Sequence, residues 1–525
     1  MRPILLTTLN ARYSHCAFGL RYLYANLKEL QPQAQIREFT INQAPRDIAE
    51  AILAQNPRLV GFGVYIWNTR QTRDVVSLLK RLRPELLIIL GGPEVTFETE
   101  SQELCQLADL TIQGESDFLF YEICRDYLAN GSLPGEKWVS GPLPEIAKIA
   151  MPYSLYSDDD LNNRVLYVEA SRGCPYKCEY CLSSLDKSVR NFDTDAFLSE
   201  MDKLIARGAR QFKFVDRTFN LSIATSSRIL RFFLDRIGQG LFLHFEMVPD
   251  RLPVELRELI AKFPPGSLQF EIGIQTWNPQ VATLVSRRMD FSKVVENFAY
   301  LTSQTGVHIH ADLIAGLPGE TVESFAQGFD AVALLRPQEI QVGILKRLKG
   351  TPIIRHDTEW QMVYQDNPPF QVLQTRTMSF ETLQGIDRFS HYWNLLANSG
   401  NFGKTMQLLD ALAAQRPEPS RYWEFDQLAR ALAQRHPQNH GVALLNLLES
   451  VWLYLTVTRG QDADEVREIL IADYSGGTTR RDVPPFLRKH QAAPTRKTAD
   501  ATATPKRQQQ HLRGEAATSA VTAAH

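Results

Sequence analysis

The stretch SRGCPYKCEYCLSS, residues 171–184, contains three of the chain's six cysteines. Cys174, Cys178 and Cys181 follow the spacing C-x3-C-x2-C. A closed structural zinc site needs four cysteine or histidine ligands, and the chain has no second C-x2-C pair and no histidine nearby in sequence. Iron–sulfur clusters also take cysteine thiolates. A four-iron cluster held by three cysteines keeps one iron open for substrate or cofactor, so the spacing favours a cluster over zinc.

The composition is that of an ordinary globular protein, with 525 residues, 44% hydrophobic, 22% charged and a formal net charge of −2. This length predicts two or three domains. The charge balance disfavours nucleic acid as a partner. No apolar run is long enough for a membrane span and no signal peptide is evident, so we expect a cytoplasmic location. Reduced, scattered cysteines there are expected to be buried and metal-free; these are Cys16, Cys105 and Cys124.

The first 135 residues alternate short apolar runs with amphipathic helical patterns. Five such pairs predict an α/β domain with a parallel, flavodoxin-like (Rossmann-like) sheet covered by helices on both faces. Ligands of these sheets lie at the carboxyl ends of the strands, where glycine lets a ligand approach the backbone. The glycines at those predicted ends are Gly63, Gly91, Gly92 and Gly114.

The rest of the chain divides into four further segments. A Gly- and Pro-rich linker is expected over 136–163. Six strand–helix pairs over 164–355 predict an open (β/α)6 barrel with its chemistry at the carboxyl-terminal rim. Residues 356–485 show helical spacing, and 486–525 lack aromatics and periodicity, which predicts a disordered tail.

The cysteine loop resembles the radical S-adenosylmethionine (SAM) superfamily, whose signature places an aromatic residue before the last cysteine. Tyr180 fills that place. In this family the open iron of a [4Fe–4S] cluster is chelated by the amino and carboxylate groups of SAM. The resemblance extends over residues 164–355 and implies that Cys174, Cys178 and Cys181 hold such a cluster.

The same resemblance implies where SAM is bound. The segments VDRTFN, FEMVPDRL, EIGIQTWNP and HADLIAGLPGET look like the second to fifth strand ends of the family. At the second strand end, VDRTFN stands where the family usually has Gly-Gly-Glu. After the fourth strand, either Arg287 or Arg288 could reach a carboxylate of the ligand. The SAM-contacting residues implied are Tyr180, Asp216, Glu246, Gln275, Arg287 and Asp312.

A flavodoxin-like sheet ahead of this barrel resembles the cobalamin-binding radical SAM proteins, and the helical C-terminal region resembles an uncharacterised bacterial subgroup of them. This implies that cobalamin binds at the four strand-end glycines. Proteins that supply a histidine to cobalt carry D-x-H-x-x-G after the first strand. His15 is preceded by Tyr13 in place of the aspartate, so we do not assign it as a cobalt ligand.

The resemblance implies an enzyme that cleaves SAM to a 5′-deoxyadenosyl radical and, with cobalamin, methylates an unactivated carbon of a small molecule. An electron donor such as flavodoxin or ferredoxin is expected as a partner. Radical cyclisation or rearrangement, and a non-catalytic cobalamin or redox sensor, are the alternatives. Methylthio transfer to RNA is disfavoured, because the three N-terminal cysteines do not lie in the loops that a second cluster needs. The C-terminal region is expected to close the barrel mouth.

Overall fold

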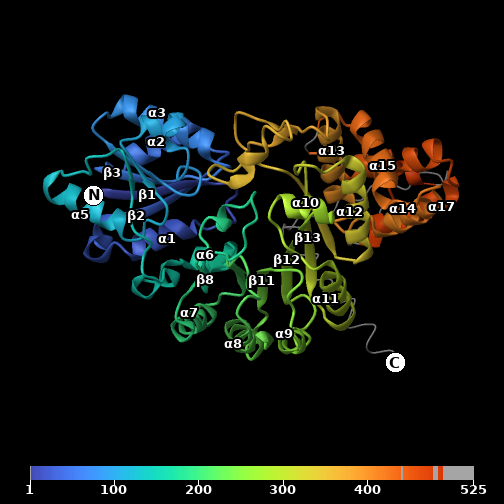
Figure 1. Cartoon of the computed structure of the whole chain (residues 1–525), viewed down its shortest axis with the longest axis horizontal. Helices are drawn as coiled ribbons and strands as arrows, with labels where there is room; N and C mark the ends of the chain where they lie inside the picture. Colours follow the sequence, from blue (N-terminus) through green and yellow to red (C-terminus); the bar gives the residue numbers. More distant parts are fainter. Residues whose placement is uncertain (1, 439–440, 477–482, 489–525) are drawn as a thin grey trace, which may run out of the picture.

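The computed structural model describes residues 2–438, 441–476 and 483–488. The predicted disordered tail, 486–525, therefore lies almost entirely outside the described residues. A sheet domain, an open barrel and a group of helices follow one another along the chain, drawn in blue to cyan, in green to yellow and in orange to red (Figure 1). Within the described part of the chain, no helix has the length and apolarity that crossing a membrane requires.

The N-terminal domain contains a six-stranded parallel sheet with the order β2-β1-β3-β4-β5-β6. Strand β1, between β2 and β3, is buried along its whole length, because α2, α3 and α4 cover one face of the sheet and α1 and α5 the other. The strands are β1 (Ile4–Asn10), β2 (Ala34–Thr40), β3 (Leu59–Gly63), β4 (Leu87–Gly91), β5 (Leu110–Gln113) and β6 (Trp138–Ser140), and the helices are α1 (Phe18–Ala25), α2 (Pro45–Leu53), α3 (Thr69–Leu82), α4 (Glu103–Leu107) and α5 (Leu119–Asn130).

The predicted linker contains regular structure. β6 pairs in parallel with β5, with Trp138 opposite Thr111, and so adds the sixth strand that the sequence did not predict. Further on, α6 (Asp158–Asn163) begins at a capping box, in which the Ser157 side chain and the Asp160 side chain each accept a hydrogen bond from the other residue's backbone N–H. Short elements flanked by glycine and proline leave little periodic signal, which explains the difference.

The central domain is an open barrel of parallel strands with the order β14-β13-β12-β11-β10-β7. Side chains alternate along the strands: in β12, Phe270 and Ile272 pack in the core, whereas Glu271 and Gln275 face the barrel interior. The strands are β7 (Leu166–Val168), β10 (Gln211–Phe214), β11 (Phe242–Met247), β12 (Leu268–Gln275), β13 (His308–Ala315) and β14 (Glu339–Ile344), and the helices are α7 (Thr194–Ala206), α8 (Ile223–Leu234), α9 (Val254–Ile260), α10 (Pro279–Leu284), α11 (Phe291–Gln304) and α12 (Val322–Leu334).

The C-terminal region covers the free edge of the barrel. The Asn398 side chain accepts a hydrogen bond from the Ile340 N–H at 3.1 Å and donates to its carbonyl at 2.9 Å, which satisfies backbone groups of the edge strand β14. Aromatic side chains of α12, α13 and α15 share one core, where Phe389 stacks on Tyr422 at 4.5 Å. After the short strands β15 (Val363–Tyr364) and β16 (Val372–Gln374) come α13 (Phe380–Leu396), α14 (Gly403–Ala414), α15 (Arg421–Arg435), α16 (Leu444–Leu453) and α17 (Ala463–Gly476).

These helices lie on the side of the barrel away from the N-terminal domain (Figure 1). Within the described residues, none of α13 to α17 lines either of the two cavities presented below. The expectation that this region closes the barrel mouth is therefore wrong for the described helices. They cover β14 and α12 because that edge of an open barrel would otherwise expose apolar surface and unpaired backbone groups.

Candidate functional site

The cysteine loop, residues 173–189, lies between two short antiparallel strands, β8 (Ser171–Arg172) and β9 (Arg190–Asn191). The loop begins at Gly173, whose φ is +91°. An added Cβ there would lie 2.1 Å from the Ser188 carbonyl oxygen. Glycine is therefore required where the two ends of the loop cross.

The three loop cysteines line one cavity of about 260 Å³, which we call the cluster cavity. Cys174 and Cys178 are buried, Cys181 is half-buried, and none of them forms a disulfide. Within the described residues, no three His, Cys, Asp or Glu side chains converge as a single metal ion requires. Three thiols spread around one cavity fit a cluster of several irons, in which each cysteine binds a different iron, better than they fit zinc.

Glu179, between the second and third cysteines, fixes the loop to the rest of the barrel. Its buried carboxylate lies 2.6 Å from Arg355 and 2.9 Å from His356, and it accepts a hydrogen bond from Ser286 Oγ at 2.5 Å. Glu179 was not predicted as a site residue. Its partners lie 107 or more positions further along the chain, so no local pattern could have indicated them.

Two predicted residues, Arg287 and Tyr180, lie directly beside the cysteines. Arg287 Nη1 is 3.6 Å from Cys178 Sγ and 3.5 Å from the Tyr180 hydroxyl. Arg287 Nε donates to the Ile274 carbonyl at 3.1 Å, which fixes the guanidinium at the end of β12. Arg287 thus contacts both the second loop cysteine and the aromatic residue before the third. Arg288 also lines the cavity, but Arg287 is the one in contact with Cys178.

Gln275 and Asp312 present polar atoms that the protein itself leaves without hydrogen bonds. Gln275 has φ +72° next to a bulge between β12 and β13, and its buried Oε1 has no partner. Asp312 Oδ1 lies 3.2 Å from His310 Nε2 without the geometry of a hydrogen bond. Burial, together with the nearby Glu271 and Glu246 carboxylates, raises the pKa of Asp312 to about 8. Such buried, unpaired groups fit a polar ligand that completes them.

Glu246 also faces the cluster cavity and forms an ion pair with Arg217 Nη1 at 3.2 Å. Burial raises the pKa of Glu246, and the Arg217 charge opposes this shift. The Arg217 side chain is 53% exposed and lines both this cavity and the larger one described below. Arg217 was not predicted as a site residue, although its neighbour Asp216 was.

Asp216 lies apart from the other predicted SAM residues. Its buried carboxylate accepts hydrogen bonds from the Ala170 N–H at 3.0 Å and from Ser171 Oγ at 2.6 Å. It lines a different, smaller cavity, and burial raises its pKa to about 7. The structure therefore places Asp216 under the base of the cysteine loop, while its neighbours Arg217 and Thr218 face the cluster cavity.

A second, larger cavity of about 690 Å³ lies between the sheet domain and the barrel, and we call it the interdomain cavity. All four predicted glycines line it. A Cβ on Gly91 would meet only the Ile112 carbonyl at 4.0 Å, and one on Gly114 would meet nothing within 4 Å, so both leave room that a ligand could fill. Gly92 differs, because its φ is +111° and a Cβ there would lie 2.4 Å from the Val64 carbonyl oxygen.

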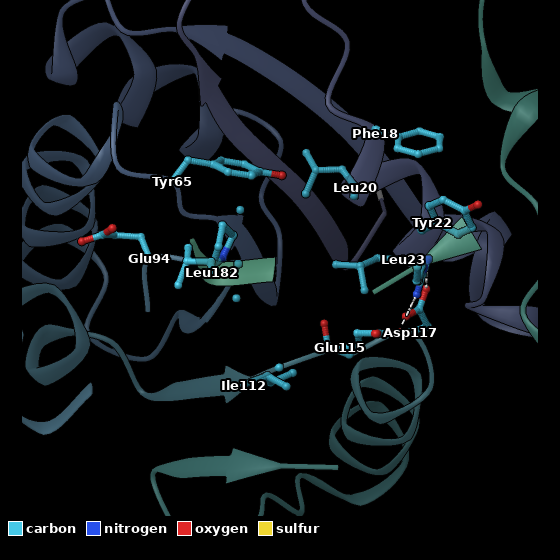
Figure 2. A pocket seen from close by; sticks show the side chains of 18 of the residues that line it. Phe18, Leu20, Tyr22, Leu23, Tyr65, Glu94, Ile112, Glu115, Asp117 and Leu182 are labelled. Carbon is cyan, nitrogen blue, oxygen red and sulfur yellow. Dashed lines mark hydrogen bonds and ion pairs between the residues drawn. The ribbon is translucent and has the colours of Figure 1, made fainter. Parts of the chain in front are cut away.

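The walls of the interdomain cavity are largely apolar and come from both domains. Figure 2 shows Tyr65 and Leu20 on one side, Ile112 on the other, and Leu182 of the cysteine loop reaching in from the barrel. Tyr65 stacks on Trp67 with centroids 4.5 Å apart. Open glycine ends beside broad apolar side chains fit a large, flat ligand such as a corrin. The barrel's contribution arises only from the tertiary structure and was not predicted.

His15 is not part of either cavity. Its Nδ1 lies 2.5 Å from the Tyr167 hydroxyl, and burial lowers its pKa. This placement agrees with leaving His15 out of the cobalt ligands, which stays a prediction. The remaining cysteines, Cys16, Cys105 and Cys124, are each buried at separate places in the N-terminal domain, and burial raises the pKa of all three thiols.

Comparison with known families agrees with the two cavities. Residues 4–123 match the B12 binding domain, residues 168–331 the radical SAM superfamily, and residues 358–523 a family described as protein of unknown function (DUF4080). The chain therefore carries a B12-binding domain followed by a radical SAM domain, and it is an enzyme. Its cofactors are a [4Fe–4S] cluster, SAM and cobalamin.

Individual relatives are distant. An uncharacterised methyltransferase of Pyrococcus horikoshii is 24% identical over 71% of this chain and 83% of its own length. The cobalamin-dependent radical SAM methyltransferase TokK of Streptomyces tokunonensis is 23% identical over 55% of this chain, which spans only 46% of that protein. One similar solved structure is that of the radical SAM methyltransferase TsrM of Kitasatospora setae, with cobalamin and a [4Fe–4S] cluster bound. It superposes with a TM-score of 0.56 at 16% identity and covers 70% of this chain and 81% of its own. This likeness shows a shared fold.

Proposed function

We propose that this enzyme methylates an unactivated carbon of a small molecule, using SAM in the cluster cavity and cobalamin in the interdomain cavity. The observation that carries the proposal is that the two cavities adjoin: Arg217 and Ser183 line both of them. A substrate at this junction would reach both cofactors at once. The similarity to proteins named as methyltransferases supports methyl transfer.

The roles of the residues follow from their positions. The three loop cysteines would hold the cluster, with the Arg287 guanidinium in contact with Cys178. Gln275 Oε1 and Asp312 Oδ1 are the unpaired acceptors available to the hydroxyl and ammonium donors of SAM, and Glu246 is a further carboxylate on the same wall. When bound, the cluster supplies the electron that cleaves SAM, and cobalamin carries the methyl group.

Cobalamin would lie against the carboxyl edge of the sheet. Gly91 and Gly114 allow its closest approach, whereas Gly92 holds the turn that forms this edge. Tyr65 and Leu182 would contact the two faces of a ligand held between the domains. Methylthio transfer is not supported, because it would need a second cluster held by the three N-terminal cysteines. These cysteines are far apart in sequence and each is buried. Within the described residues they do not form a group of metal ligands.

The test is the product pattern of the anaerobically reconstituted protein with SAM and a strong reductant, or with reduced flavodoxin or ferredoxin as the electron donor we propose. A methyltransferase should form both 5′-deoxyadenosine and S-adenosylhomocysteine. The second compound is what remains of SAM after it has donated its methyl group. A cyclase would form 5′-deoxyadenosine alone. A fully loaded protein that forms neither compound would be a sensor, and the proposal would fall.

A further inference from the structure

Both strands that flank the cysteine loop carry an arginine that reaches the N-terminal domain. Arg172 of β8 pairs with Arg190 of β9 across the two-stranded ribbon. Both arginines contact Glu115, which follows Gly114 at the end of β5: Arg172 Nη1 lies 2.8 Å from the carboxylate, and Arg190 Nη2 contacts its other oxygen. Glu115 itself lines the interdomain cavity (Figure 2). We call Arg172 and Arg190 the arginine pair.

Arg172 is held on all sides by buried groups. Its guanidinium lies 2.9 Å from Asp117, which together with Glu115 forms the turn after β5, and 3.0 Å from Glu169 of the barrel. It also lies over the Tyr22 ring, 4.6 Å from the centroid, and its side chain is only 13% exposed. Breaking a buried ion pair leaves an uncompensated charge. If the turn after β5 shifts, Arg172 must therefore move with it.

Arg190 continues the connection into the loop. Its guanidinium lies 3.0 Å from the Asp186 carboxylate, and the Asp186 carbonyl accepts a hydrogen bond from the Cys174 N–H, also at 3.0 Å. Contacts therefore run without a gap from the strand-end glycine at the interdomain cavity, through Glu115 and Arg190, to the first cysteine. Such a continuous network can carry coupling between two sites.

We propose that the arginine pair couples the two cofactor sites, so that cobalamin in the interdomain cavity favours the cluster-binding conformation of the cysteine loop, and the cluster favours cobalamin. The inference rests on the cofactor positions given under the proposed function. Arg172 and Arg190 act as positioning residues, through the turn on one side and the loop on the other. By linkage, each cofactor raises the affinity of the other by the same factor.

The experiment compares the affinity for hydroxocobalamin of the cluster-free and the cluster-reconstituted protein under anaerobic conditions. In the wild type we expect the cluster to strengthen binding by about 5- to 150-fold, the range usual for coupled sites. In Arg190→Gln and Arg172→Met this ratio should fall to about 1 if the pair carries the coupling. The matched control is Arg164→Gln, which breaks another interdomain ion pair, to Glu38 at 2.7 Å, away from both cavities, and should keep the wild-type ratio.

A second measurement does not need the cluster at all. Hydroxocobalamin added to the cluster-free wild type should slow hydrogen exchange over residues 174–181, which do not line the interdomain cavity, and Arg190→Gln should abolish this protection. Arg190→Gln carries the test if Arg172→Met fails to fold, because Arg190 has fewer buried partners. A wild-type ratio near 1, or an unchanged ratio in Arg190→Gln, would overturn the coupling and leave the proposed function standing. A reconstituted wild type that binds no hydroxocobalamin would instead refute the proposed function itself.

Discussion

The glycines at the strand ends allow ligand exclusion to be separated from damage to the fold. In Gly91→Val, the new side chain would project into the interdomain cavity, since its Cβ meets only one atom, 4.0 Å away, and valine suits the end of a strand. Crowding of this kind costs about 1–3 kcal/mol, or about 5- to 150-fold in affinity. We therefore expect Gly91→Val to bind hydroxocobalamin that much more weakly, with its melting temperature unchanged.

Gly92→Ala should behave in the opposite way. The backbone there has φ +111°, and the new Cβ would lie 2.4 Å from the Val64 carbonyl oxygen. Backbone strain alone costs about 1–3 kcal/mol, which should lower the melting temperature by several degrees, about 3 °C at the least. A loss of cobalamin binding in a Gly92 variant would thus report a damaged turn as well as a blocked site.

The assay is a hydroxocobalamin titration followed by absorbance, together with thermal unfolding of the same samples. Gly135→Val is the matched control, because a Cβ at Gly135 meets nothing within 4 Å and the residue lies outside the cavity. If Gly91→Val bound cobalamin as the wild type does, the ligand would not lie against this edge of the sheet. If Gly92→Ala melted at the wild-type temperature, the steric reasoning would be wrong.

Three further predictions concern the barrel. Replacing the three loop cysteines with alanine should abolish iron uptake on anaerobic reconstitution, whereas replacing the three N-terminal cysteines should not; near-stoichiometric iron in the first variant would contradict the cluster assignment. Asp312→Ala should weaken SAM binding by about 10- to 150-fold, because losing one charge-assisted contact costs about 1.5–3 kcal/mol. The iron content should stay intact. If calorimetry shows wild-type affinity for SAM, Asp312 is not part of the site. Burial raises the pKa of Glu320 from 4.5 to about 8. Between these two pH values the folded chain retains a proton that the unfolded chain has released. The free energy of unfolding should therefore fall as the pH rises from 4.5 to about 8. Glu320→Gln should flatten that slope in denaturant titrations at several pH values, and an unchanged slope would show that Glu320 does not cause it.

Much of the fold and part of the site could be predicted because their signals are local. Apolar runs and helical periodicity depend on neighbouring residues, and they located the strands of both sheets except β6. The cysteine spacing and the strand-end glycines are likewise read within a few positions, and the structure brings each set to one cavity. β6 was missed because three residues between glycines and prolines carry almost no pattern.

Side-chain direction beyond a strand end was the first thing that the sequence could not determine. Asp216 and Arg217 are neighbours, yet Asp216 is buried under the cysteine loop and Arg217 faces both cavities. Which of two consecutive residues faces a site depends on how the backbone turns after β10, and nothing in the residue types fixes that turn. The family resemblance selected Asp216 for its position after the second barrel strand, whereas the residue that lines the cluster cavity is Arg217.

What the sequence by itself determined is the set of chemical groups: three cysteines in one loop, glycines at successive strand ends, and carboxylates along the barrel strands. Only the tertiary structure decided how the two halves meet. Glu115 and Arg172 are 57 positions apart, and Glu179 and His356 are 177 apart. Contacts at such separations arise because burying two charged groups is favourable only when each finds its partner, and the docking of whole domains selects that partner.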